Sequence, residues 1–271
     1  MSVEALLLPP AFGCYALAGA GALTTVHHGL RRLERYVFAL LLLGLGLHTA
    51  ALAARWYTLG HGPFTTMYEV LSSNIWSLLV IMAFAYLRWT PARPALLVGL
   101  PIIGLLAAWM AAADPSPGHL PPTYATYLLY VHVVLGKIFL GLLIVAVGIG
   151  GVVWLRRTRW GTPRLAGLPP DAALDELAYR FAAGAVVFET LMLISGAMWA
   201  QDAWGRYWAW DPLETWAFLT WLALIATLHA RATWKLPPRA SSLLLLGVFV
   251  LAFLTFFGVP FISTSPHKGA I

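Results

Sequence analysis

The sequence contains few charged residues for its length. Of its 271 residues only 10% are Asp, Glu, Lys or Arg, and 60% are hydrophobic. A soluble domain carries about 25% charged residues. The shortage of charge therefore excludes an ordinary soluble domain and favours a protein that is embedded in lipid.

Cysteine is nearly absent as well. Cys14 is the only one, so the chain can form no internal disulfide and has no Cys-x-x-Cys redox pair. Internal repeats and low-complexity tracts are also lacking. If the protein takes part in thiol chemistry, the thiols must belong to another protein.

Apolar runs of about twenty residues recur along the whole sequence, which is the length that a helix needs to cross a bilayer. The runs are continuous and rich in Leu, Ala and Gly, whereas the strands of a membrane β-barrel alternate. We therefore predict an all-α integral membrane protein, a single polytopic domain over 1–271 with about eight transmembrane helices. The expected spans are 4–25, 36–55, 70–88, 94–112, 125–155, 180–200, 214–233 and 241–259.

Basic residues occur in every second connection between these spans and predict the orientation. They are Arg31, Arg32, Arg35, Arg88, Arg93, Arg156, Arg157, Arg159, Arg164, Arg231, Lys235 and Arg239. The connections near 56–69, 113–124 and 201–213 contain only Arg206. Because cytoplasmic loops are rich in Lys and Arg, we expect the second set and both termini on the outer side of the inner (plasma) membrane. The net charge of +6 is then explained by topology, without nucleic acid.

The segment 161–179 is the longest of the connections expected in the cytoplasm. Asp171 in it is expected to cap a short amphipathic helix that lies on the membrane surface. This connection is the only sizeable cytoplasmic feature that the sequence predicts.

The segment 204–216, WGRYWAWDPLETW, concentrates four Trp and one Tyr. Its Asp-Pro-Leu-Glu part is typical of a helix start: Asp211 caps, Pro212 takes the first position, and Glu214 can return to the N–H of the cap. Aromatic belts at membrane interfaces explain one or two of the rings. Four rings precede the cap, and these are Trp204, Tyr207, Trp208 and Trp210. The external loop 201–216 is therefore expected to form a broad, flat, apolar surface for a large planar ligand.

Four of the eight histidines are candidate metal ligands. His132 and His267 fall near the outer ends of the fifth and eighth spans, on the side of the aromatic loop. Imidazole nitrogen beside a flat apolar surface is what an iron porphyrin requires, although His267 alone reads as a solvated tail residue. His229 lies within the seventh span, where ionisable residues are often functional, or it only orients the helix beside Arg231. His48, in the middle of the second span, competes with His229.

These residues resemble a known family. The segment WGRYWAWDPLETW is similar to the tryptophan-rich WWD signature of haem-handling proteins in cytochrome c maturation, in the form of the CcsA (ResC) family of the system II pathway. Three further segments are similar to that family: GHGPFTTMYEVL at 60–71, YVHVVLGK at 130–137 and LHAR at 228–231. The segment GVPFISTSPH at 258–267 stands where the family has its second external histidine, although Ser-Thr-Ser-Pro replaces the usual Gly-rich approach. The resemblance covers roughly residues 35–271. Thr66 and Val70 stand where the family has Asn and Ser.

The resemblance implies that haem b is both ligand and transported substrate. It assigns His132 and His267 to the iron at an external site and His229 to a transmembrane site. His48, which only its position in the second span nominates, competes with His229 as a ligand or partner there. The resemblance assigns the ring to the tryptophan-rich loop, that is, to Trp204, Tyr207, Trp208, Trp210, Asp211 and Trp216.

The family also implies the reaction and the partners. Haem would pass from the cytoplasmic side to the external site and be attached by thioether bonds to the C-x-x-C-H motif of an apocytochrome c. The expected partners are that apocytochrome, the CcsB (ResB) membrane subunit, a thioredoxin-like thiol reductant and the lipid bilayer. Synthase activity is expected only together with CcsB.

Two other functions fit parts of the sequence. A b-type membrane cytochrome in quinone-linked electron transfer needs two histidines that face each other at one depth. His132 and His267 instead fall at the outer edge of the membrane. A regulatory protein of the haem pathway on the same scaffold would not need the aromatic loop. The sequence therefore favours haem transport and presentation.

Overall fold

The computed structural model describes residues 2–259, and its regular elements in that range are all helices. Eight helices are long and apolar enough to cross a membrane, which confirms the predicted all-α fold with eight spans. The long α-helices of these spans are α1 (Val3–His28), α2 (Glu34–Leu59), α3 (Met67–Arg88), α4 (Leu96–Ala112), α5 (Tyr127–Leu155), α7 (Asp171–Trp204), α8 (Pro212–Trp234) and α9 (Pro238–Phe253). Short helical segments adjoin them: η1 (Arg31–Leu33), η2 (Thr90–Ala95), η3 (Pro122–Tyr124), α6 (Gly161–Arg164) and the π-helical turn η4 (Leu254–Gly258). Three spans also include the adjoining η1, η2 or η4.

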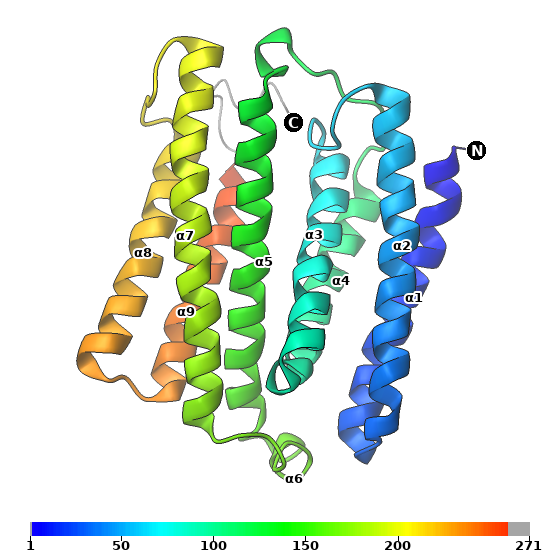
Figure 1. The fold of residues 1–271 in the computed structure, drawn as a ribbon, viewed down its shortest axis with the longest axis vertical. Coiled ribbons are helices and arrows are strands. Elements are labelled where there is room, and N and C mark those ends of the chain that lie inside the picture. The colour runs from blue at the N-terminus through cyan, green and yellow to red at the C-terminus, as the bar shows by residue number, and fades with distance from the viewer. Residues whose placement is uncertain (1, 260–271) are drawn as a thin grey trace.

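The long helices alternate in direction along the chain (Figure 1). The connections 29–33, 89–95, 156–170 and 235–237 lie at one end of the bundle, which we call the arginine end. The N-terminus and the connections 60–66, 113–126 and 205–211 lie at the other end, which we call the loop end. This grouping of connections matches the grouping that the charge pattern predicts. Which end faces the cytoplasm stays a prediction.

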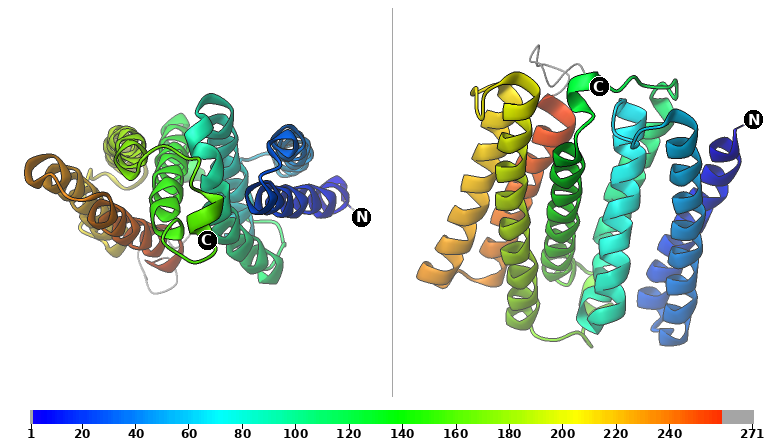
Figure 2. Two further views of the ribbon diagram at one scale, coloured as in Figure 1. Left: turned by 90° about the horizontal axis from the view of Figure 1, so that it is seen from below. Right: turned by 45° about the horizontal axis from the view of Figure 1, so that its top comes forward.

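Helix α5 is the central element of the bundle. It packs against α3, α4, α7 and α9, whereas α1 and α8 lie on opposite flanks (Figure 2). A Cβ atom at Gly148 would lie 3.1 Å from the Ala95 carbonyl oxygen, and one at Gly150 would lie 3.1 Å from the Ser242 Cβ. Small residues let helix backbones approach closely inside a membrane. The glycines of α5 therefore place the helices around it at short distance.

Polar caps fix the helix ends that surround the candidate site. At the start of α5 the Thr126 side chain accepts a hydrogen bond from the backbone N–H of Leu129. Asp211 caps α8 in the same way, and Gly205, with a left-handed φ of 73°, caps the C-terminal end of α7 after Trp204. Such caps satisfy backbone groups that the helix leaves unpaired. They hold α5, α7 and α8 in register at the loop end.

Two predicted boundaries differ from the structure. Asp171 does not cap a separate surface helix, because α7 runs without a break from Asp171 to Trp204. The Asp171 carboxylate bonds to Arg156 and Arg157, each at 2.6 Å, and a buried stripe that begins at Leu174 continues along α7. The non-helical part of the tryptophan-rich segment is also shorter than 201–216 and comprises residues 205–211, which we call the aromatic loop.

Candidate functional site

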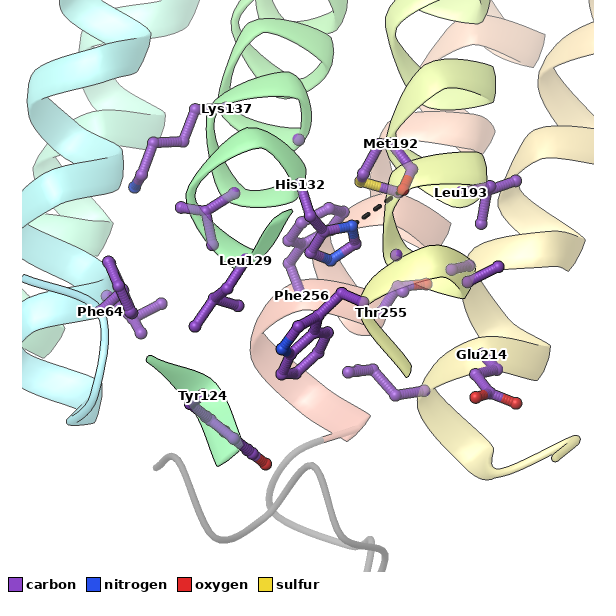
Figure 3. A pocket seen from close by; sticks show the side chains of 18 of the residues that line it. Phe64, Tyr124, Leu129, His132, Lys137, Met192, Leu193, Glu214, Thr255 and Phe256 are labelled. Carbon is purple, nitrogen blue, oxygen red and sulfur yellow. Dashed lines mark hydrogen bonds between the residues drawn. The ribbon is translucent and has the colours of Figure 1, made fainter. Parts of the chain in front are cut away.

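An apolar cavity of about 220 Å³ lies at the loop end between α3, α5, α7 and α8 (Figure 3). Part of its wall comes from the aromatic loop and from η4. Three of the residues that the sequence nominates line it, namely His132, Tyr207 and Trp208. The fold thus brings α5 and the aromatic loop, which are far apart in the sequence, to the same cavity.

His132 is held in a defined state by α7. Its Nδ1 lies 2.8 Å from the main-chain carbonyl oxygen of Met192. A carbonyl only accepts, so Nδ1 carries the proton, and the ring in its neutral form has its lone pair on Nε2. A hydrogen bond of this kind is the usual way to orient a metal-binding imidazole. The bond to Met192 thus fixes the tautomer of the neutral ring, with Nε2 as its acceptor nitrogen.

Gly196 makes room for that imidazole. A Cβ atom at position 196 would lie 2.7 Å from His132 Nδ1 and 2.8 Å from its Cε1. On the same helix, Trp199 stacks on the imidazole with ring centroids 6.1 Å apart and an interplanar angle of 23°. Helix α7 thus provides the hydrogen bond, the space and the stacking surface for His132. Nothing in the sequence around Gly196 indicated this role.

Trp204 contacts Trp199, the residue that stacks on His132. It is the last residue of α7 and packs on Trp199 at 5.0 Å between centroids, while Tyr124 packs on Trp199 at 5.0 Å from another side. Burial raises the pKa of the Tyr124 phenol, and the charge of the Asp211 carboxylate raises it further. Tyr124 lines the cavity. Trp204 therefore acts on the cavity through Trp199 and Tyr124.

The two tryptophans of the aromatic loop occupy different environments. Trp208 is half-buried and lines the cavity, and its buried indole Nε1 has no hydrogen-bond partner within residues 2–259. Trp210 is 66% exposed and has a left-handed φ of 60°. The two rings meet edge to face at 5.6 Å, and both contact Phe218 of α8. Tyr207, which is 62% exposed, also lines the cavity.

The helix cap at Asp211 confirms half of the predicted capping box. Asp211 Oδ1 accepts from the Glu214 N–H at 2.9 Å, as expected. Glu214 Oε2 accepts from the Ala209 N–H at 2.7 Å, not from Asp211, because the left-handed Trp210 folds the chain back over the first turn of α8. Glu214 thus ties the aromatic loop to α8. Trp216 is half-buried on α8 and is not among the described residues that line the cavity.

His48 is not among the described residues that line this cavity, and it lies where α1, α2 and α3 meet. Its side chain is fully buried, with Nδ1 3.3 Å from the Tyr15 hydroxyl and Nε2 3.1 Å from the Ser72 hydroxyl. Both ring nitrogens are therefore used in side-chain hydrogen bonds. His48 therefore packs between α1, α2 and α3 and links them through Tyr15 and Ser72.

His229 is exposed on α8, and its Nε2 lies 3.4 Å from Thr233 Oγ1. It follows Pro212 by about 25 Å along the helix at 1.5 Å per residue, so it lies toward the arginine end. Helix α2, which carries His48, and helix α8 lie on opposite flanks of the bundle (Figure 2). The structure therefore joins His229 neither to His48 nor to His132. His267 lies outside the described residues.

The segment GHGPFTTMYE has a structural role in this fold. Arg55 bonds through Nε to Glu69 Oε1 at 2.8 Å and through Nη1 to Glu4 Oε2 at 2.9 Å, and all three residues are buried. Arg55 Nη2 also donates to the Pro115 carbonyl at 3.1 Å, and Glu69 Oε2 accepts from the Thr65 N–H at 2.9 Å. This network ties three helices and two connections together beside the cavity.

Lys137 is a further lining residue that the sequence analysis did not nominate. It lies five residues after His132 on α5. The signal was present, because Lys137 is the only charged residue between positions 127 and 155.

These features define a polytopic helical membrane protein with an aromatic, histidine-bearing cavity at one end. Residues 30–267 match the family described as cytochrome c assembly protein, and the chain belongs to that family. It is 30% identical over 251 residues to the cytochrome c biogenesis protein CcsA of Synechococcus sp. (strain CC9902), with 82% of each chain covered. It is 26% identical over 284 residues to CcsA of Porphyra purpurea, with 89% of this chain and 88% of the relative covered. The resemblance to the CcsA family is thereby confirmed.

The fold is also similar to that of a solved structure, the cytochrome c haem lyase CcmF. The TM-score is 0.72 over 95% of this chain, at 21% sequence identity. The match covers 47% of the CcmF chain. At this identity the likeness concerns the fold alone.

Proposed function

We propose that this protein moves haem b across the membrane and presents it to apocytochrome c for covalent attachment, as the channel and synthase subunit of system II cytochrome c biogenesis. The observation that carries the proposal is the state of His132. Its Nδ1–H is bound by the Met192 carbonyl, so Nε2 would be the nitrogen that binds the iron, and His132 lines an apolar cavity. Axial imidazole and a flat aromatic surround are the two things that haem needs from a protein.

Under this proposal, different residues around the cavity would bind the iron, contact the macrocycle and position those that do. His132 would bind the iron, with His267 as the second external ligand, and Trp208 and Tyr207 would pack against the macrocycle. Trp204 would hold Trp199 behind His132, and Asp211 would fix the start of α8 and so the position of the aromatic loop. Trp210 and Trp216 would contribute to the outer part of the aromatic surface.

The chemistry of attachment requires little from this chain beyond positioning. Each thiol of the C-x-x-C-H motif adds across a vinyl double bond of the haem, with sulfur bonded to one carbon and hydrogen to the other, so the step needs no oxidant. Positioning of reacting groups contributes about 7–11 kcal/mol in favourable cases. Thiols come from the apocytochrome, kept reduced by a thioredoxin-like protein, because Cys14 is the only cysteine here.

The location and the partners follow from the same proposal. The loop end would face outward from the inner (plasma) membrane, since the basic connections lie at the arginine end and basic loops stay in the cytoplasm. A CcsB-type membrane subunit would complete the synthase. His229, which is exposed on α8, would hold haem nearer the arginine end on its way to the external site.

The b-type cytochrome alternative receives less support. A bis-histidine haem within the membrane needs two imidazoles that face each other. His48 and His229 are carried by helices on opposite flanks, and both nitrogens of His48 bind other side chains. The proposed function therefore rests on the external cavity and not on a haem in the middle of the bundle.

The proposal is tested by covalent haem attachment. The chain is co-expressed with a CcsB-type partner and a C-x-x-C-H cytochrome c in cells that lack their own maturation system. We expect His132→Ala and Trp208→Ala to abolish or strongly reduce haem-stained cytochrome. His28→Ala, which changes an exposed histidine at the arginine end, should leave it unchanged. Equal attachment with His132→Ala and with the unaltered chain would refute the proposal.

A further inference from the structure

Lys137 lies within an otherwise apolar stretch of the membrane-spanning helix α5. It follows Tyr127, the first residue of α5, by ten positions, which places its Cα about 15 Å below the loop end at 1.5 Å per residue. A charged side chain at such depth is costly, and in membrane proteins it marks a binding site or an ion pathway more often than a structural contact. The position therefore calls for a partner that stabilises an ammonium group.

The partners of Lys137 within residues 2–259 are neutral. Its Nζ donates to Ser73 Oγ at 2.8 Å and to Asn74 Oδ1 at 3.3 Å, both on α3. Every ion pair found in that part of the chain involves an arginine. Two neutral acceptors orient the ammonium but do not balance its charge, and an unbalanced charge within a membrane-spanning segment is unfavourable. The missing component is an anion.

The anion can reach Lys137 through the cavity already described. Lys137 and Asn74 line that cavity together with His132. In Figure 3 the Lys137 side chain extends from α5 toward α3, while His132 extends toward α7, so the two occupy different sides of one space. A molecule held at His132 therefore has Lys137 within the same enclosure.

Two charged residues that line the cavity lie on opposite sides of it. Besides Lys137, the other residue with a full charge that lines it is Glu214 on α8, within the described chain. Glu214 bonds to the Ala209 N–H and lies on the opposite side from Lys137 (Figure 3). An anionic group entering the cavity is attracted to the α3–α5 side and repelled from the α8 side.

We propose that Lys137 binds a carboxylate of the molecule that occupies the cavity and thereby sets the orientation in which that molecule is held. The inference rests on the proposed function, under which the molecule is haem and the carboxylate is a propionate. A fatty acid carries the same group on an apolar body and is the other source of this chemistry. Lys137 is thus a positioning residue for the substrate.

The test compares haem with haem dimethyl ester, whose propionates carry no charge. Binding of both is measured by absorption titration to the full chain in phosphatidylcholine nanodiscs. The variants are Lys137→Gln and Lys137→Arg, with Arg159→Gln as the matched control, because Arg159 is exposed in the connection 156–170 at the arginine end. A charge-assisted hydrogen bond is worth about 1.5–3 kcal/mol, so we expect Lys137→Gln to bind haem about ten- to a hundredfold more weakly.

The expected pattern is specific to a carboxylate. Lys137→Arg should retain most of the affinity, and Arg159→Gln should retain all of it. The ester should bind the unaltered chain as weakly as haem binds Lys137→Gln. The affinity for the ester should be the same in Lys137→Gln as in the unaltered chain. Equal affinity of the unaltered chain for haem and ester would overturn the proposal, and this comparison needs no variant to fold.

Two more measurements separate the sources and the underlying function. In the first, oleate is used to displace haem from the unaltered chain and from Lys137→Gln. If haem and ester bind equally and oleate displaces haem only when Lys137 is present, Lys137 does not bind a haem propionate and the carboxylate site belongs to a fatty acid. Binding of haem and ester that is both strong and independent of His132 would instead refute the proposed function. Loss of affinity in His132→Ala together with equal binding of haem and ester refutes only the role of Lys137.

Discussion

The imidazole of His132 and the main chain of Met192 are joined by a hydrogen bond of 2.8 Å between Nδ1 and the carbonyl oxygen. The bond connects α5 to α7 and fixes which ring nitrogen carries the proton. Gly196, one turn further along α7, leaves the space in which the ring sits. The orientation of a candidate iron ligand is thus determined by the backbone of a neighbouring helix.

The first prediction concerns that space. In Gly196→Ala the added methyl group would meet His132 Nδ1 at 2.7 Å, so the imidazole or α7 must move. A misplacement of about 1 Å costs as much as a hundredfold in positioning-dependent reactions, so we expect haem attachment to fall at least about tenfold. Gly184→Ala is the control on the same helix, because its methyl would lie 3.4 Å from Leu142 Cδ1, an ordinary contact. Equal attachment in both variants would contradict the positioning argument.

The second prediction separates the two tryptophans of the aromatic loop. Trp208 lines the cavity and Trp210 is largely exposed outside it. We expect Trp208→Ala to weaken haem binding about tenfold, from lost apolar area and lost ring contact. Trp210→Gly should have a small effect, since glycine adopts the φ of 60° at position 210 without strain. Haem titration measures both, and a larger loss in Trp210→Gly would reverse the assignment.

The third prediction concerns Asp211, whose side chain caps α8. Removal of such a cap costs about 0.5–2 kcal/mol, and serine at this position can replace aspartate. Asp211→Ala should therefore lower the thermal unfolding temperature and loosen the aromatic loop, whereas Asp211→Ser should keep both stability and haem binding. If Asp211→Ser is stable but no longer binds haem, Asp211 acts on the ligand directly.

The fourth prediction concerns the buried network at the loop end. Arg55→Gln would leave the carboxylates of Glu4 and Glu69 facing each other without their shared cation. Breaking a buried ion pair costs about 3–5 kcal/mol, so thermal unfolding in detergent should shift to clearly lower temperature. Arg180→Gln breaks an exposed pair with Glu176, where about 1 kcal/mol or less is at stake. Similar shifts in the two variants would show that the network is not what holds these helices together.

Features that depend on local sequence could be predicted. The eight spans follow from uninterrupted apolar runs, and the cap at Asp211 follows from four consecutive residues. Features that arise where helices meet could not. The contacts of His132 with Met192 and Gly196 depend on the distance and rotation between α5 and α7, which no spacing within one helix reveals.

The same distinction explains the remaining differences. The sequence did not show that Glu214 would bind Ala209, because this depends on the left-handed backbone at Trp210. The continuous α7 was missed because the start of its polar stretch before residue 180 is stabilised by ion pairs of Asp171 with Arg156 and Arg157, which follow α5. In each case a residue distant in the sequence, or one uncommon backbone angle, decided the outcome.

The central claim is that His132 binds the iron of haem at the loop end, and chemical rescue of the histidine tests it most directly. The chain and its CcsB-type partner are purified as His132→Gly, with and without imidazole, and the haem absorption spectrum and covalent attachment are measured. We expect both to be lost in His132→Gly and both to return with imidazole, because free imidazole can fill the space and bind the iron. An unchanged spectrum and unchanged attachment in His132→Gly without imidazole would contradict the claim.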